Sequence, residues 1–203
     1  MDRTARWDAI YTMQAPEEVS WYQASPDVSL ALIAATGVGK DARIIDVGGG
    51  ASVLVDHLLD AGVFRLTVLD VSGAAIRHAR TRLGNRADRV TWVEADIAAG
   101  TLSGTFDVWH DRAAFHFLTD SEDRERYLDA VNQVVPAGGH VLIAAFALEG
   151  PPRCSGLEVR RYSPAALQEE LGARFELVET RRELHTTPAN AQKAFLYARF
   201  RKR

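Results

Sequence analysis

Acidic side chains stand at or just after the carboxyl ends of four apolar segments of this 203-residue chain. These acids are Asp46, Asp70, Asp96 and Asp111. In a parallel sheet the carboxyl ends of the strands meet at one edge, where ligands bind. Unpaired carboxylates gain nothing from a dry sheet edge, so four of them indicate a site for a polar ligand. A helix N-cap is the competing interpretation for any single acid, above all for Asp70 and Asp96.

Three consecutive glycines, Gly48, Gly49 and Gly50, follow the first of these segments. An apolar run, glycines and a helical pattern predict a strand, a tight turn and a helix, which is half of a nucleotide-binding unit. Asp70 lies about 20 residues further on, where dinucleotide-binding folds place the acid that holds ribose hydroxyls. Val53 stands where the G-x-G-x-x-G pattern has its third glycine. We therefore expect a related fold that binds an adenosine ligand other than NAD.

Strands and helices alternate along the rest of the chain. Apolar runs predict a parallel sheet, and two final strands without a helix between them predict an antiparallel hairpin. The fold class is therefore α/β: a doubly wound, mostly parallel seven-stranded sheet with helices on both faces and an antiparallel C-terminal hairpin. The expected strands are 43–47, 64–69, 89–94, 106–111, 140–148, 175–184 and 194–200.

Local signals set the helix boundaries that position the strand-end acids. Ser72 and Ser163-Pro164 are typical of helix starts, and Ser25-Pro26 is interpreted in the same way. The segment from Thr119 to Glu122 has the spacing of a capping box. Residues 2–13 place apolar side chains on one face of a short amphipathic helix.

Length and composition indicate one domain spanning residues 1–203, because 203 residues with 47% hydrophobic content can bury one sizeable core. The formal net charge of -3 predicts no general attraction to nucleic acid or membrane. The basic stretch 199–203 is interpreted as a solvated strand end. A single cysteine, Cys154, excludes an internal disulfide and is interpreted as an ordinary loop residue.

The N-terminus lacks the apolar core of a signal peptide, and no apolar run reaches the length of a membrane span. We therefore expect a cytoplasmic protein. The spacing of His57, His78 and His185 does not match a metal-ligand pattern, so no metal is expected. Residues 1–25 form an N-terminal helix and arm in which Trp21 and Tyr22 either cap the core or fold over the ligand as a lid.

Several motifs in order resemble the class I, seven-stranded S-adenosylmethionine-dependent methyltransferases. They are the turn Asp46-Val47-Gly48-Gly49-Gly50, the acid Asp70, the segments 94–97 and 106–108, and the turn Pro136-Ala137-Gly138-Gly139. The resemblance runs from the first strand to the end of the chain. It implies S-adenosylmethionine as the cofactor and S-adenosylhomocysteine as its product.

The resemblance also implies which residues contact the cofactor. The glycine turn would approach its methionine part, with Asp46 beneath the ammonium group. Asp70 would accept from the ribose hydroxyls, and Asp96 from the adenine amino group. The remaining implied contacts are Val71 and Ile97 at the adenine, and His110 and Asp111 beside the sulfonium and its methyl group.

Two resemblances within the family point to different acceptors. The pair Asp111-Arg112 and the loop Gly150-Pro151-Pro152 are similar to thiopurine and thiol methyltransferases, which act on small sulfur or chalcogen compounds. Trp7-Asp8, Tyr11 and Ser20-Trp21-Tyr22 are similar to a group containing elongation-factor lysine methyltransferases, which usually has Asp-Lys-Gly where this chain has Asp111-Arg112-Ala113. We expect a small nucleophilic acceptor, such as a thiol. A protein lysine methyltransferase and a non-catalytic adenosine-binding module are the alternatives.

Methyl transfer from a sulfonium is an in-line displacement, so the protein mainly aligns the acceptor and removes water. A general base is needed only when the acceptor arrives protonated. His116 is the candidate for acceptor contact or proton removal, together with Asp111. Arg112 either binds an acceptor carboxylate or pairs with a strand-end acid.

Overall fold

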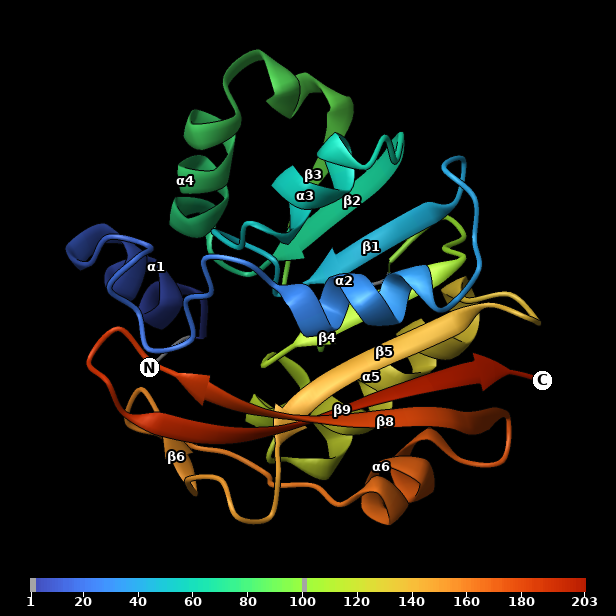
Figure 1. Cartoon of the computed structure of the whole chain (residues 1–203). Coiled ribbons are helices and arrows are strands. Elements are labelled where there is room, and N and C mark those ends of the chain that lie inside the picture. The colour runs from blue at the N-terminus through green and yellow to red at the C-terminus, as the bar shows by residue number, and fades with distance from the viewer. Residues whose placement is uncertain (1–2, 100–101) are drawn as a thin grey trace.

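The computed structural model describes residues 3–99 and 102–203. Its centre is a seven-stranded sheet with the order β3-β2-β1-β4-β5-β9-β8 (Figure 1). β1 to β5 are parallel, and β9 runs antiparallel to both β5 and β8. The predicted doubly wound sheet with its antiparallel C-terminal hairpin is therefore confirmed. The strands are β1 (Arg43–Val47), β2 (Arg65–Asp70), β3 (Val90–Glu94), β4 (Val108–Arg112), β5 (His140–Phe146), β8 (Phe175–Thr186) and β9 (Gln192–Lys202).

Helices cover both faces of this sheet. On the central strand β5 every residue is buried, and alternate side chains enter opposite cores. Val141 and Ile143 pack on the face that α5 and α6 cover, whereas Leu142 and Phe146 pack on the face of α2 and α3 (Figure 1). The helices are α1 (Arg3–Met13), α2 (Asp27–Ala34), α3 (Leu54–Asp60), α4 (Gly73–Leu83), α5 (Ser121–Val134) and α6 (Pro164–Leu171), with short 3₁₀ turns η1 (Gly84–Arg89) and η2 (Phe115–Phe117).

Two predicted helix starts are confirmed and two are corrected. The hydroxyls of Ser72 and Ser163 each accept a backbone N–H at 3.1 Å and cap α4 and α6. Pro26, not Ser25, occupies the N-cap position of α2, and the Ser25 hydroxyl bonds the Asp27 carboxylate instead. Asp120, not Thr119, caps α5, because its carboxylate accepts from the Glu122 N–H at 2.8 Å.

A two-stranded hairpin outside the main sheet was not predicted. It consists of β6 (Arg153–Cys154) and β7 (Leu157–Glu158). Strands of two residues are too short to give a period-two signal in the sequence. The hairpin buries Cys154, which is 4% exposed. No helix among the described residues is long and apolar enough to cross a bilayer.

α1 and the connector after it lie across the carboxyl ends of the central strands (Figure 1). The carboxylate of Asp8 in α1 accepts from the Ser72 hydroxyl at 2.7 Å and from the Ala74 N–H at 2.9 Å. These bonds hold the pKa of Asp8 below its usual value. Asp8 therefore serves as a second cap for α4, supplied by a distant segment, and fixes α1 beside the strand that ends in Asp70.

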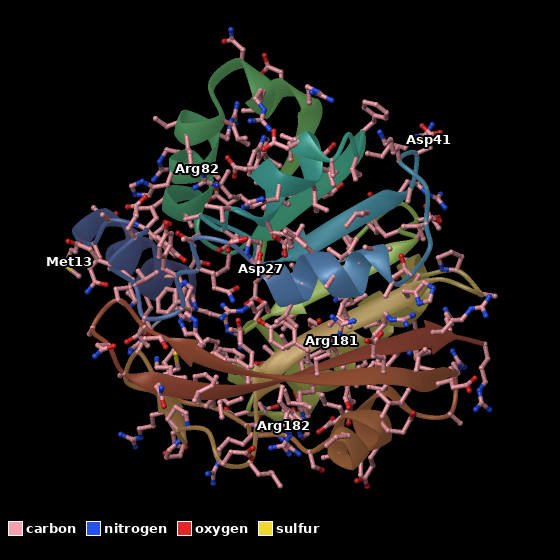
Figure 2. All side chains as sticks on the ribbon, in the orientation of Figure 1. Met13, Asp27, Asp41, Arg82, Arg181 and Arg182 are labelled. Carbon is pink, nitrogen blue, oxygen red and sulfur yellow. The ribbon has the colours of Figure 1, made fainter. Side chains whose placement is uncertain are left out.

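Asp8→Ala should lower the unfolding temperature, because it removes a capping carboxylate worth about 1 kcal/mol. For a chain of this size that loss corresponds to roughly 2–4 °C. Asp41→Ala is the matched control, since Asp41 is exposed and lies at the end of β1 remote from α1 (Figure 2). Calorimetry on both variants and the wild type measures the difference. Equal unfolding temperatures for the two variants would contradict the capping role.

Candidate active site

The glycine turn after β1 is packed so tightly that side chains do not fit. Gly48 has φ +69°, and a Cβ atom there would lie 2.7 Å from the Cβ of Ala114. A Cβ on Gly50 would lie 2.5 Å from Asp70 Oδ2, and one on Gly49 would overlap the Asp46 carboxylate. The turn is therefore bare main chain that a ligand can approach closely.

Asp46 is the buried acid beneath this turn. Its Oδ1 accepts from His110 Nδ1 at 2.7 Å, and His110 Nε2 lies 2.8 Å from the Ser29 hydroxyl. Asp46 Oδ2 is buried and has no hydrogen-bond donor among the described residues. A buried anionic oxygen without a donor is unfavourable, so this atom is suited to receive a cationic N–H donor from a ligand. Both ring nitrogens of His110 are engaged in positioning Asp46.

Asp70 closes the end of β2 and is 7% exposed. Its carboxylate accepts from the Ser72 N–H at 2.8 Å. Burial, together with the nearby carboxylates of Asp46 and Asp8, raises the pKa of Asp70 to about 7. Asp70 and its neighbour Val71 line a cavity at the strand ends. Hydroxyl donors from a ligand would favour the ionised form of Asp70.

Asp96 and Ile97 line the same cavity, and Asp96 is already paired. Arg3 in α1 donates from Nη1 to both oxygens of Asp96, at 2.9 and 2.7 Å, and the Ala98 N–H donates at 2.9 Å. Arg3 also bridges to Asp123 at 2.5 Å. No local pattern predicts this bridge, because its partners are 93 and 120 residues from Arg3.

Two neighbouring cavities meet at Gly48. The larger extends from Asp70 and Ile97 to an aromatic end formed by Phe117, Phe146 and Phe195. The smaller lies beside the glycine turn. Its lining includes Ser29, Asp46, Gly49, His110 and Tyr22. The residues common to both linings are Tyr11, Trp21, Gly48 and Arg112.

Trp21 lies over the junction of the two cavities. Its Nε1 donates to the Tyr11 hydroxyl at 2.9 Å, and its ring packs edge-on against Trp7 at 5.6 Å between centroids. Trp7 in turn packs against Phe117 at 5.0 Å. Tyr22 lines the smaller cavity only. The arm therefore contributes an aromatic roof to both cavities.

Arg112 connects this roof to the sheet. Nη1 donates to the Trp21 carbonyl at 2.9 Å and Nε to the Tyr197 hydroxyl at 2.8 Å. Its ion pair is with Glu183 of β8 at 3.7 Å, not with a strand-end acid. The next residue, Ala113, has φ +68°, a left-handed conformation that favours glycine. Related sequences with glycine at this position would avoid that strain, which Ala113 bears in the cavity wall.

Asp111 is placed beneath the cavity rather than in its wall. Its carboxylate is fully buried and accepts from the N–H groups of Ala114 and Phe115, both at 3.0 Å, and from the Tyr127 hydroxyl at 2.8 Å. Burial raises its pKa to about 6. Asp111 therefore lines neither cavity, whereas the resemblance implied a place beside the transferred methyl group. This side chain shapes the turn after β4.

His116 is also enclosed by protein and lines neither cavity. Its Nδ1 accepts from the Phe146 N–H at 3.3 Å, and its ring packs against Phe117 and Phe146. Burial, together with the cations Arg112 and Lys193, lowers its pKa to about 3. A base with so low a pKa removes protons poorly near neutral pH. The geometry does not support the predicted acceptor contact or general-base role.

Sequence reasoning missed Lys193 and Phe195 in the cavity wall. Both belong to the beginning of β9, where Phe195 pairs with Phe146 at the end of β5. An antiparallel strand brings its first residues to the edge where parallel neighbours end. The predicted hairpin therefore contained the signal, although it was not used to extend the site. Cys154 lines the same end of the cavity.

The sheet order reverses between β1 and β4, and the cavities lie at the carboxyl ends of these strands. Such a switch point, with a glycine turn and strand-end acids, defines a Rossmann-like ligand-binding domain. Residues 44–139 match the family model described as a methyltransferase domain. The architecture is that of the class I S-adenosylmethionine-dependent methyltransferases.

Comparisons with individual proteins agree with this class. The "eEF1A lysine and N-terminal methyltransferase" of Danio rerio is 25% identical over 147 residues, which are 70% of this chain and 21% of that protein. The chain thus spans about a fifth of the length of the curated relatives it matches.

Solved structures of N-methyltransferases share the fold. NodS from Bradyrhizobium japonicum WM9, in complex with S-adenosyl-l-homocysteine, has a TM-score of 0.74 at 19% identity and covers 99% of each chain. The 1,6-didemethyltoxoflavin-N1-methyltransferase of Burkholderia thailandensis has a TM-score of 0.71 at 20% identity, covering 98% of this chain and 83% of that one.

The buried Asp70 gives the protein a characteristic pH dependence. Its pKa is about 7 in the folded protein, above its ordinary value of 3.8, so folding disfavours its ionisation and the stability of the fold decreases as pH rises through this window. The asparagine side chain of the Asp70→Asn variant cannot ionise, so the variant does not lose stability in this way as pH rises. The unfolding temperature of the variant minus that of the wild type should increase from about pH 4 to about pH 8.

Thermal unfolding of ligand-free protein across this range, in buffers of constant ionic strength, measures that difference. The exposed Asp41→Asn is the matched control, for which the difference should stay nearly constant. A pH-independent difference for Asp70→Asn would show that this carboxyl does not carry the raised pKa.

Proposed function

We propose that this domain transfers a methyl group from S-adenosylmethionine to a small nucleophilic acceptor. The aromatic roof is the observation that supports a small acceptor. Trp7 and Trp21, tied to Tyr11 and Arg112, cover the cavity end where an acceptor would sit. A small molecule fits beneath such a roof, whereas a side chain presented by another protein requires an open channel.

The residues around the glycine turn suit this cofactor. The buried, donorless Asp46 Oδ2 would accept from the ammonium group of the methionine part, which lies against the bare Gly48-Gly49-Gly50 main chain. Asp70 would accept from the ribose hydroxyls, with Val71 and Ile97 beside the adenine. The adenine amino group would share Asp96 with Arg3 or displace it.

The bound cofactor supplies an activated methyl group on a positively charged sulfur. The chain holds the acceptor in line with that methyl group and excludes water by means of the roof. The acceptor lone pair forms the new bond as the carbon–sulfur bond breaks, and the sulfur becomes a neutral thioether. A protonated acceptor would release its proton to solvent or to a group other than the deeply buried His116 and Asp111.

Methylation of a protein lysine or N-terminus is the second candidate. It is favoured by the name of the Danio rerio relative, an eEF1A lysine and N-terminal methyltransferase. The matched part is about a fifth of that protein, so the remainder of the relative has no counterpart in the chain described. The small-molecule acceptor named for the Burkholderia thailandensis enzyme supports the first candidate, on a structure that matches nearly the whole chain.

Titration with S-adenosylhomocysteine should give saturable heat with the wild type. Asp70→Asn should bind at least about tenfold more weakly, because it removes a charge-assisted acceptor for hydroxyl groups. The exposed Asp41→Asn should bind like the wild type. If the wild type gives no heat, or Asp70→Asn binds with unchanged affinity, the cofactor site lies elsewhere.

Labelled-methyl transfer separates the two acceptor classes. A cell extract is split into a desalted protein fraction and a low-molecular-weight fraction, and each is incubated with the enzyme and methyl-labelled S-adenosylmethionine. We expect label in small products from the second fraction. Label confined to acid-precipitable protein from the first would replace the small-acceptor proposal with protein methylation. Asp70→Asn serves as the background in both arms.

A further inference from the structure

Two cations lie against a pair of aromatic rings at one end of the larger cavity. The adenine of the cofactor would bind at the opposite end. The rings of Phe146 and Phe195 lie 4.8 Å apart between centroids. The Arg112 guanidinium carbon lies 4.5 Å from the centre of the Phe195 ring, and Lys193 Nζ lies 5.7 Å from that of Phe146. All four residues line the larger cavity. An apolar floor with two cations beside it is therefore open to a ligand.

The hydrogen-bonding capacity of both cations is incompletely used. The Arg112 side chain is 10% exposed, and its Nη2 is buried with no hydrogen-bond partner among the described residues. Glu183 lies 3.7 Å from it, beyond hydrogen-bond range, and its own oxygens accept from Gln23 and Tyr197. A buried guanidinium N–H without an acceptor is unfavourable, so Arg112 Nη2 is suited to donate a hydrogen bond to an oxygen atom of a ligand.

Lys193 has polar neighbours but no counter-ion. Its Nζ donates to the Ser20 hydroxyl at 2.7 Å and lies 3.9 Å from Cys154 Sγ. Within the described part of the chain, no carboxylate lies within ion-pair distance of it. The acids of the larger cavity, Asp70 and Asp96, belong to its adenine side. Lys193 is therefore a cation without a counter-ion at the aromatic end, whereas Asp70 and Asp96 lie at the opposite end.

The sheet order separates these two ends. β9 is three strands from β1, in the order β1-β4-β5-β9. At a spacing of about 4.8 Å per strand, Lys193 lies about 14 Å across the sheet from the glycine turn. Lys193 is thus too far from the turn to serve the methionine part of the cofactor. Phe117, Phe146 and Phe195 lie in the wall of the same cavity.

We propose that this end of the cavity binds the negatively charged group of the methyl acceptor, and that the acceptor is a small molecule with an apolar, flat body and a carboxylate. Arg112 Nη2 and Lys193 Nζ hold the carboxylate, and the phenylalanine rings contact the body. The reacting atom then points toward Gly48 and Ala114. This assignment rests on the proposed transfer to a small acceptor and defines its chemical class.

The same charges disfavour a lysine acceptor. A lysine side chain would bring an ammonium group, or an amine that must lose a proton, next to two cations in a cavity of low dielectric constant. Repulsion of that kind selects against the wrong partner as effectively as attraction selects the right one. Arg112 and Lys193 are thus specificity residues that discriminate by charge.

Matched fluorinated probes test this assignment. 4-(Trifluoromethyl)benzoate, the corresponding benzamide and the corresponding benzylamine are titrated by ¹⁹F NMR into protein saturated with S-adenosylhomocysteine. The benzoate should bind at least about tenfold more tightly than the amide, and the amine should bind most weakly. Lys193→Met should weaken benzoate binding about tenfold and leave the amide unchanged. Glu183→Gln should strengthen benzoate binding, because it removes the anion that competes for Arg112.

Lys40→Met is the matched control. Lys40 is exposed and precedes β1, so it lies where the parallel strands begin, whereas the cavity lies where they end. It should bind all three probes like the wild type. If Lys193→Met is poorly folded by circular dichroism, Lys193→Gln and Glu183→Gln carry the test. Equal affinities for benzoate and amide, no binding of either probe, or insensitivity to both substitutions, would overturn the assignment. Saturable binding of S-adenosylhomocysteine in the same samples keeps that result distinct from failure of the cofactor proposal.

Discussion

The absence of side chains in the turn after β1 is the constraint on which the rest of the site depends. Each position where a Cβ atom would stand is already occupied by a neighbour: Ala114 at Gly48, the Asp46 carboxylate at Gly49, and the Asp70 carboxylate at Gly50. The turn thus brings together the ends of β1, β2 and β4. Two carboxylates are held buried and oriented before any ligand arrives, which is how a preorganised site limits the cost of binding.

The roof depends on the same strand ends. α1 contacts the edge twice, through Asp8 at the start of α4 and through Arg3 at Asp96. Asp8 is bonded beside Asp70, and its charge contributes to the raised pKa of that acid. Arg3 occupies oxygens of Asp96 that a ligand amino group would otherwise contact. Short, direct contacts therefore couple the position of α1 to the pKa of Asp70 and to the hydrogen bonding of Asp96.

Much of the fold could be predicted from local patterns, because apolar runs, serine caps and glycine stops are each encoded within a few residues. The strand-end acids and the glycine turn were located for the same reason. Side-chain direction was not accessible in this way: Asp111 lies near the end of β4 and His116 follows β4, but both side chains turn into the core, where backbone N–H groups bind them. Contacts between distant segments, such as Arg3 with Asp96 and Lys193 with Ser20, leave no pattern in a single sequence.

Charge is distributed along the larger cavity in the order in which the two reactants would lie. Asp70 and Asp96 face the end where a cationic donor would bind, and Arg112 and Lys193 face the other. Asp70, Arg112 and Lys193 belong to strands of one sheet and Asp96 lies just beyond the end of β3, so strand spacing sets the separation of the two groups. An acceptor anchored by its anion reaches the methyl group only if its length matches that separation. In the proposed assignment, rigid placement of these charges would orient the acceptor and limit its size with the same few residues.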